Sequence, residues 1–465
     1  MSLVITDNNP YINFYLESSN DSIITTAYAN SLRRILLRSI KSLGFKYIPY
    51  KHLDNYIIIN ENSSNNIHND KLSKRISLLT INTPCIKLLI LIYLINNEHY
   101  NDKTKLKLYN IQNYLEKIIF KINVTNKSQE SSFVTTNDID IFLDDVNLLN
   151  LNISKITDFQ PFEYFTDLVD LIELLKQNKV KDFVVNIRNK IFNHIEIDDN
   201  IYPKLLTELN HNEKLVSSMK LSIGKNIDDV TWDVVSSISY SFEKDYEQIA
   251  MNLNDMVAEI DDKLGDYQTN RWDNIDTFKL TKELIEERNQ IEDTELRALI
   301  KEKDLLIQRY NIHDSYRIFK KNDNRVPSKF NLSFKYEGVH NNRRILYKSF
   351  KELKNQIKDF KGLFKNVIAV PYQDDHIKIL YSENLEDAID IYVEKSTHTI
   401  MNLINDYLYY LIVAKEDHYY TAYNRTHKLS DKYLLRLICG NFKEDILKVC
   451  DYLIKMTDDI IKNNF

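Results

Sequence analysis

The chain has 465 residues, of which 43% are hydrophobic and 28% are charged, as is usual for a protein with a substantial folded core. Its length predicts two or three domains, because a single core rarely serves more than about 250 to 300 residues. The net charge of −6 at pH 7 disfavours a protein whose main task is to bind DNA directly, since such proteins usually carry a basic excess.

The first strong signal along the chain is an amphipathic helix over residues 29–43, after a predicted strand at 11–16. At about 100° per residue, one face of this helix is apolar and the other is basic. The apolar face is formed by Leu32, Ile35, Leu36 and Leu43. The basic stripe is formed by Arg33, Arg34, Arg38 and Lys41. We expect the apolar face to pack against a partner helix, whereas the basic stripe is either solvated or docks another protein.

The next elements favour the α+β class. A strand is predicted at 56–60 and a short basic helix at 70–79. Residues 85–219 mix strand and helix patterns without a clear motif. Residues 245–312 are highly charged and show helical spacing in two segments, which predicts a helical hairpin.

A second amphipathic helix is predicted at 397–411, after strands at 377–380 and 388–393. Its apolar stripe is formed by Ile400, Leu403, Ile404, Tyr407, Leu408 and Leu411. Asn402 points to the opposite face, and a last helix is predicted at 442–462. Each of the two amphipathic helices therefore has an apolar stripe to bury.

These two helices resemble a pair found in one known family. Residues 29–37, ANSLRRILL, resemble the first helix of the α-like subunits of DNA-directed RNA polymerases, the third subunit of the eukaryotic enzyme and the bacterial α chain. Residues 398–403, HTIMNL, resemble the matching helix of the small eleventh subunit, usually His-Thr-Leu-Gly-Asn-Leu. The single chain therefore resembles both halves of a heterodimer.

Other segments extend the resemblance in the order found in the family. The segment at 70–78 keeps an arginine but has Lys74 and Ser77 where the family has His and Gly. The segment at 423–429 resembles Tyr-x-x-x-His-Pro-Leu, with Lys428 in place of Pro. The family positions matched in this way, for which the resemblance implies structural roles, are Asn30, Arg75, Trp232, His398, Asn402, Tyr423 and His427.

The resemblance implies an architecture of two RNA polymerase α-type dimerisation domains paired within one chain. The third-subunit-like domain would be discontinuous, covering 1–84 and 220–365 and carrying the helical insertion at 245–312. An inserted α/β domain would occupy 85–219, and the eleventh-subunit-like domain 366–465. The two apolar stripes would then meet inside the molecule, so that no homodimer is required.

The resemblance also implies a function. Such a chain would be a non-catalytic assembly platform that binds the largest and second-largest polymerase subunits and a small tenth-subunit-like protein, with DNA contacted only through the complex. The basic stripe would dock the second-largest subunit, because arginine suits carboxylate and backbone acceptors. Fused subunits of this kind are similar to those of large DNA viruses, which implies the host cytoplasm, the viral factory and the virion as locations.

Several kinds of site are excluded by what the sequence lacks. Cys85, Cys439 and Cys450 form no CxxC pair, so we expect no zinc site, no disulfide framework and a reducing intracellular compartment. No segment fits a phosphate loop, a nucleophile elbow or an HExxH site, so we expect no cofactor and no catalytic residue. No apolar run is long enough to cross a membrane, and no secretory signal is visible at the start.

Two other interpretations remain open. In the first, the chain is a helical scaffold that binds partners through the charged hairpin at 245–312. In the second, it is a nucleic-acid-processing enzyme, for which Asp374, Asp375 and His376 have suitable side chains. Adjacent residues diverge in direction, however, so a solvated turn is the simpler explanation of that cluster.

Overall fold

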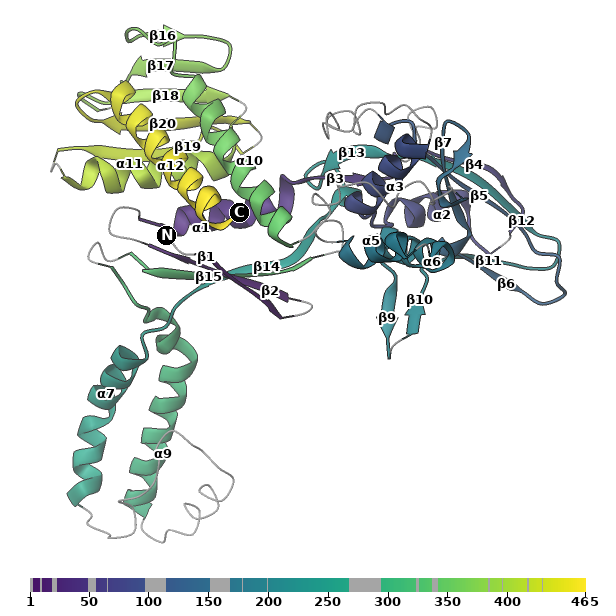
Figure 1. Cartoon of the computed structure of the whole chain (residues 1–465). Helices are drawn as coiled ribbons and strands as arrows, with labels where there is room; N and C mark the ends of the chain where they lie inside the picture. The colour runs from purple at the N-terminus through teal and green to yellow at the C-terminus, as the bar shows by residue number, and fades with distance from the viewer. Residues whose placement is uncertain are drawn as a thin grey trace. The chain divides into compact units, whose positions relative to one another are not determined.

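The computed structural model describes residues 3–8, 11–18, 23–48, 56–64, 66–96, 114–150, 168–177, 179–198, 200–266, 294–322, 326–336, 342–383, 385–394, 396–415, 418–428 and 430–465. The chain mixes helix and sheet, as the predicted α+β class requires (Figure 1). It divides into two compact units. The smaller contains Tyr15–Thr26 and Tyr240–Asn331, and the larger contains Leu3–Phe14, Ala27–Ser239 and Leu332–Phe465.

The smaller unit contains a pair of long helices, α7 (Tyr246–Asp266) and α9 (Thr294–Arg309), which pack side by side (Figure 1). Their shared core is formed by Leu253, Val257, Ile307 and Tyr310. The hydroxyl of Tyr310 donates a hydrogen bond of 3.0 Å to the carbonyl of Ile249. The hairpin predicted at 245–312 therefore corresponds to these helices, while the part of its second segment before residue 294 lies outside the described residues.

The same arrangement of strands and helices occurs twice in the chain. Each copy, called a repeat below, runs strand, strand, helix, strand, strand, helix, and its sheet has the order first, second, fourth, third strand. The first repeat comprises β1 (Leu3–Asn8), β2 (Tyr11–Glu17), α1 (Thr26–Arg38), β14 (Val235–Phe242), β15 (Lys329–Tyr336) and α10 (Asn342–Gly362). The second comprises β17 (Ile377–Tyr381), β18 (Ile389–Glu394), α11 (His398–Leu411), β19 (Tyr420–Arg425), β20 (Lys432–Ile438) and α12 (Phe442–Asn464), with β16 (Tyr372–Gln373) added at the sheet edge.

The helices of the two repeats bury residues at matching positions. In α1 the buried residues are Ala27, Tyr28, Ala29, Ser31, Leu32, Ile35 and Leu36. In α11 they have the same spacing and are Thr399, Ile400, Met401, Leu403, Ile404, Tyr407 and Leu408. In α10 they are Ile345, Leu346, Ser349, Phe350, Leu353, Ile357 and Phe360. The α12 set repeats that spacing and adds Met456: Asp445, Ile446, Val449, Cys450, Leu453, Met456, Thr457 and Ile460.

Between α1 and β14 the chain forms a lobe built on the sheet β4-β12-β5-β7-β8. The sheet strands are β4 (Ile57–Asn62), β5 (Ile119–Thr125), β7 (Ile139–Leu143), β8 (Val146–Asn147) and β12 (Lys214–Lys220). The lobe's remaining elements are β3 (Lys41–Gly44), α2 (Asn69–Ser77), α3 (Thr83–Asn96), β6 (Ser132–Thr135), α5 (Val169–Lys176), α6 (Val180–Ile191), β9 (Ile195–Ile197), β10 (Asn200–Tyr202), β11 (Leu205–Leu209) and β13 (Ser222–Lys225).

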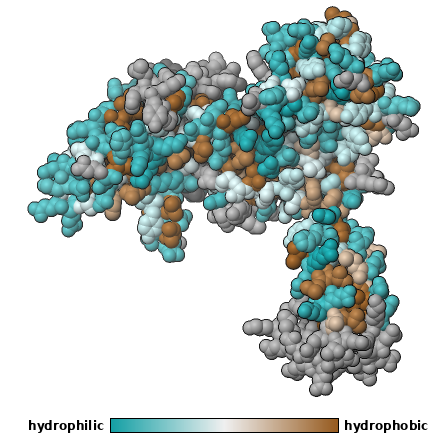
Figure 2. Space-filling model, turned by 180° about the vertical axis from the view of Figure 1, so that it is seen from behind, coloured by the Kyte–Doolittle hydropathy of each residue, from teal (hydrophilic) through white to brown (hydrophobic). Residues whose placement is uncertain are grey.

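One hydrophobic core unites this lobe, from Leu43 to Leu221. Because β4 and α2 contribute to it, the predicted boundary between residues 84 and 85 falls inside the core. The hairpin β9–β10 carries exposed apolar side chains, which appear as brown patches above its hydrophilic tip in Figure 2. Within the described part of the chain, no helix is both long enough and apolar enough to cross a membrane.

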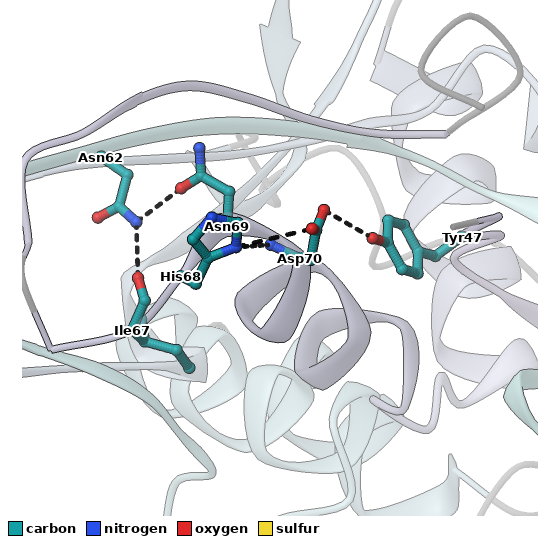
Figure 3. Close-up of polar contacts among 6 residues, drawn as sticks. All are labelled: Tyr47, Asn62, Ile67, His68, Asn69 and Asp70. Carbon is teal, nitrogen blue, oxygen red and sulfur yellow. Dashed lines mark hydrogen bonds and ion pairs between the residues drawn. The ribbon is translucent and has the colours of Figure 1, made fainter. Parts of the chain in front are cut away.

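The start of α2 shows how the lobe fixes its loops (Figure 3). His68 is the N-cap, and its Nδ1 accepts a hydrogen bond of 3.4 Å from the backbone N–H of Asp70. The hydroxyl of Tyr47 donates to Asp70 Oδ1 at 3.0 Å, and the amide of Asn62 donates to the carbonyl of Ile67 at 3.2 Å. These bonds tie the loop between β4 and α2 to both neighbouring elements.

Candidate functional site

Helix α1 is shorter than the sequence pattern predicts. It ends at Arg38, so Lys41 and Leu43 lie on strand β3 and not on the helix. The last carbonyls of α1 find partners outside the helix, because Asn226 Nδ2 donates to Leu37 and the N–H of Ile227 donates to Arg38. The chain then leaves the helix and pairs as β3 with β13.

Helix α1 contacts both helices of the second repeat through hydrogen bonds. Ser31 Oγ donates to the carbonyl of Thr399 at the start of α11, at 3.3 Å. The hydroxyl of Tyr28 lies 3.2 Å from Oγ1 of Thr457 on α12. Thr457 Oγ1 already donates to the carbonyl of Leu453, so Tyr28 is the donor between the two hydroxyls. The two repeats thus share a buried polar contact.

The residues of the two predicted apolar stripes are buried in the helices as expected, except for Leu43 and Leu411. Leu32, Ile35 and Leu36 lie on the buried side of α1, while Leu43 is buried in the core of the inserted lobe. On α11 every predicted residue is buried except Leu411, which is half-buried.

The long helices α10 and α12 complete the contact between the repeats, and Figure 1 shows them lying alongside each other. Two ion pairs link them, Lys354 to Asp458 and Lys361 to Asp451. All four side chains are at least partly exposed, so these pairs contribute little stability but fix the register of the two helices.

Three of the residues singled out from sequence come together where α1 meets the second repeat. The ring of His398 packs edge to face against Tyr423 and Tyr433, at centroid distances of 6.2 and 4.8 Å. Burial lowers the pKa of His398, and the charges of Arg34 and Arg425 lower it further. Burial raises the pKa of Tyr423, which the charge of Arg34 opposes. A neutral imidazole therefore sits among aromatic rings, with Arg34 of the first repeat nearby.

The predicted basic stripe does not form one uniform face. Arg33 and Arg34 are half-buried, whereas Arg38 and Lys41 are exposed. Arg33 Nε donates to Asn30 Oδ1 at 3.0 Å, which holds its guanidinium along the helix. Arg34 is the member of the stripe whose charge acts on the second repeat.

The remaining sequence-predicted residues lie apart from this contact. Arg75 Nη1 donates to the carbonyl of Leu206 at 2.7 Å, which joins α2 to β11. Trp232 is buried against Gly224, and its Nε1 donates to the carbonyl of Ser222 at 3.3 Å. Asn402 is half-buried on α11, and His427 is exposed after β19.

Sequence reasoning missed one ion pair in the second repeat. Asp390 on β18 faces Arg436 on β20 in the sheet register, and Arg436 Nε and Nη2 donate to the two carboxylate oxygens at 2.6 and 2.7 Å. Asp390 is only 5% exposed. Both residues alternate with core residues such as Ile391 and Leu435, so they lie on the opposite face of the sheet, where a sequence pattern predicts exposed charges. Only the pairing of the two strands, which the sequence does not show, brings them together.

Asp374, Asp375 and His376 lie exposed around the turn between β16 and β17. In the described parts of the chain, no three His, Cys, Asp or Glu residues are placed so that they could hold a metal ion.

No family model and no curated protein sequence matches this chain. The chain's own residues and the contact between its two repeats are therefore the basis on which its function is inferred.

Proposed function

We propose that the protein is a non-catalytic assembly subunit of a multisubunit DNA-directed RNA polymerase. In this proposal the two repeats are fused third-subunit-like and eleventh-subunit-like halves, and together they form a platform on which the two large catalytic subunits assemble. Nucleotide polymerisation would belong to those partner subunits. The fold class alone carries no function, so the proposal needs support from particular residues.

One observation carries the proposal. The chain contains the same strand and helix arrangement twice, with the same sheet order and matching buried positions, and the helices of one copy pack on those of the other. The two segments that resemble the third and eleventh subunits, 29–37 and 398–403, lie in the equivalent helices α1 and α11 of the two copies. A fusion of two related subunits that dimerise through these helices accounts for both facts.

Fusion also has a physical consequence for assembly. Two separate subunits must meet before their apolar helix faces are covered, whereas linked repeats meet at a high effective concentration. Burying a face at about 25 cal/mol per Å² then stabilises the platform before any large subunit arrives.

The test is affinity purification of the native protein in moderate salt, followed by mass spectrometry. We compare wild type with Arg33→Glu/Arg38→Glu, since Arg34 also acts on the second repeat. The matched control is Lys358→Glu/Lys365→Glu, which makes the same change in net charge at exposed positions near the end of α10. Large polymerase subunits that accompany wild type and the control, but not the arginine variant, would support the platform and its docking face. A protein that copurifies with no polymerase subunit would contradict the proposal.

A second candidate, a helical scaffold, is favoured by the α7–α9 pair. This pair has a small core of its own and exposes Met251 and Leu305, at 60% and 57%, and Ile312 in the turn after α9 is 64% exposed. The variant Met251→Asp/Leu305→Asp tests it in the same purification. Loss of all partners in this variant alone would favour the scaffold, whereas loss in the arginine variant alone would favour the polymerase platform.

A further inference from the structure

The outer face of the lobe's sheet is partly exposed, and its residues alternate along each strand with residues that point into the core. Along β5, Phe120 and Ile122 point into the core, while Lys121 and Asn123 point away from it. Along β12, Met219 points into the core and Ser218 and Lys220 point outward. The outward residues of these two strands and of β4 therefore form one continuous surface.

Three lysines meet on this surface. Lys121 lies opposite Ser218 in the register, and Lys220 is two residues further along β12 on the same face. The backbone N–H of Lys220 donates to the carbonyl of Tyr56 at 2.8 Å, and the N–H of Tyr56 donates to the carbonyl of Lys46 at 3.2 Å. Strand pairing and backbone hydrogen bonds thus bring Lys46, Lys121 and Lys220 to the same part of the sheet face as Tyr56.

The same residues line an open groove of about 1040 Å³. Among the described residues, its lining includes the three lysines, Tyr56, exposed Ile58 and the amide of Asn60, and no carboxylate. Two carboxylates beside the groove are paired, and Glu116, Asp228 and Asp229 line an adjoining pocket that shares Lys46, Tyr56 and Lys220 with it. Asp140, which lies opposite Lys121 on β7, is 3.6 Å from Arg188 Nη2, and Glu61 is 2.7 Å from Lys214 Nζ. The described lining of the groove therefore carries positive charge, with further carboxylates in the adjoining pocket, although the whole chain has a net charge of −6.

The exposed aromatic ring on this face favours nucleic acid over an acidic peptide as the anionic partner. Tyr56 is 39% exposed, and Ile58, two residues further along on the same face, is 51% exposed. Lys121 Nζ lies 4.5 Å from the ring centroid of Phe142, which holds that cation on the surface. Lysines along a groove attract phosphates, and an exposed ring offers a platform for an unpaired base. An acidic peptide would use the lysines but not the ring.

We propose that this lysine-lined sheet face binds single-stranded nucleic acid. The phosphates lie along Lys46, Lys121 and Lys220, and a base stacks on Tyr56. A duplex keeps its bases stacked inside and presents none to the ring, so it binds more weakly. This inference goes beyond the assembly function and does not depend on it, because the purified full chain alone carries the groove.

Fluorescence anisotropy of the purified full chain tests the proposal. The probes are labelled oligouridylate and oligothymidylate of about 20 nucleotides, which separate RNA from DNA as the source, and a DNA duplex of the same length. With three lysines on a single strand, the slope of log K against log salt is expected near −2. Lys121→Glu/Lys220→Glu should weaken binding about tenfold or more and flatten that slope.

Two further variants make the test specific. Lys358→Glu/Lys365→Glu changes the net charge equally on another element and should keep wild-type binding. Tyr56→Leu should weaken binding about fivefold or more, while Tyr56→Phe, which keeps the ring, should not. Thermal unfolding of each variant checks that the lobe is intact. The proposal is overturned by absent binding, by equal binding of duplex, by equal loss in both lysine variants, or by displacement of the strand by polyglutamate at an equal charge concentration.

Discussion

The hydroxyl of Tyr28 donates a hydrogen bond to Oγ1 of Thr457, and both side chains are completely buried. One residue is near the start of the first repeat and the other is near the end of the second. The bond therefore reports directly on whether the two repeats are packed together.

A double-mutant cycle measures that contact. Tyr28→Phe should lower the free energy of unfolding by about 1 kcal/mol, because the ring stays and one hydrogen bond is lost. Combined with Thr457→Val, the cycle should give a coupling of about 0.5 to 1.5 kcal/mol in denaturant unfolding. Tyr28→Phe paired with Ser128→Ala, which shares no partner with Tyr28, should show additive effects. A coupling of zero between Tyr28 and Thr457 would mean that the repeats do not meet in this way.

Gly224 has no room for a side chain. A Cβ at this position would lie 2.2 Å from Cδ2 of Trp232, whose indole is buried and hydrogen-bonded. We expect Gly224→Ala to destabilise the lobe by about 3 kcal/mol, since the indole must move. The matched control is Gly362→Ala in α10, where no atom beyond the glycine's chain neighbours and the adjacent helix backbone lies within 4 Å of the added carbon. That change should stabilise slightly, by about 0.5 to 1 kcal/mol, and equal effects in the two variants would refute the predicted clash.

The pair of Asp390 and Arg436 should matter more than the pair of Arg425 and Asp431. Asp390 is buried, so Arg436→Met would leave its carboxylate without its cation and cost about 3 kcal/mol. Asp431 is 83% exposed in its pair, and Asp431→Asn should cost less than about 1 kcal/mol. Chemical unfolding of the two variants compares the costs directly. A loss of 1 kcal/mol or less for Arg436→Met would show that the buried carboxylate is compensated in another way.

The lowered pKa of the Lys348 ammonium group makes the stability of the protein depend on pH. Burial lowers its pKa to about 7, with Arg344 and Lys87 adding to the effect. The unfolded chain has an ordinary lysine pKa near 10.4, so it binds the proton more readily than the folded chain. The stability linked to this group is therefore complete above about pH 10.4 and is lost as the pH falls towards 7.

Replacing the lysine tests this sign. Lys348→Met keeps the apolar stem and should raise the free energy of unfolding by about 1 to 3 kcal/mol at pH 7, and by less as the pH rises towards 10. The exposed Lys358→Met should change it by less than about 0.5 kcal/mol at either pH. A gain that does not shrink with rising pH would exclude the protonation of Lys348 as its cause.

Periodicity was sufficient to place the helices but not their ends or partners. The stripes of α1 and α11 follow helical spacing, so their burial could be predicted residue by residue. The end of α1 at Arg38 depends on Asn226 and Ile227, which lie far along the chain, and no local pattern marks it. The strand at Ile57–Asn62 was visible as a strand, but its pairing with Lys214–Lys220 was not, because strand partners are set by tertiary contacts.

In the candidate site, too, the buried helix positions could be predicted from the sequence but the tertiary contacts could not. Apolar positions were predictable because burial repeats along a helix, whereas Arg34, His398 and Tyr423 lie near one another only once the two repeats are packed. The basic stripe was assigned to one helix face, yet Lys41 is on a strand. A run of basic residues in the sequence shows which charges are present. Whether they share one face depends on where the helix ends, and α1 ends before Lys41.

The two repeats differ chiefly in how much chain is inserted between equivalent elements. In the first, long segments separate α1 from β14 and β14 from β15, while the second joins the corresponding elements by short connections. Both inserted segments leave and return at neighbouring positions, where Gly44 pairs with Ser222 and the N–H of Glu243 bonds to the carbonyl of Lys329. Because the ends are held close together, additional length adds only slowly to the entropy of closing the loop. The second repeat therefore contains only the elements that both repeats share. The first repeat has two sites, between α1 and β14 and between β14 and β15, where whole substructures are inserted while the order of its strands and helices stays the same.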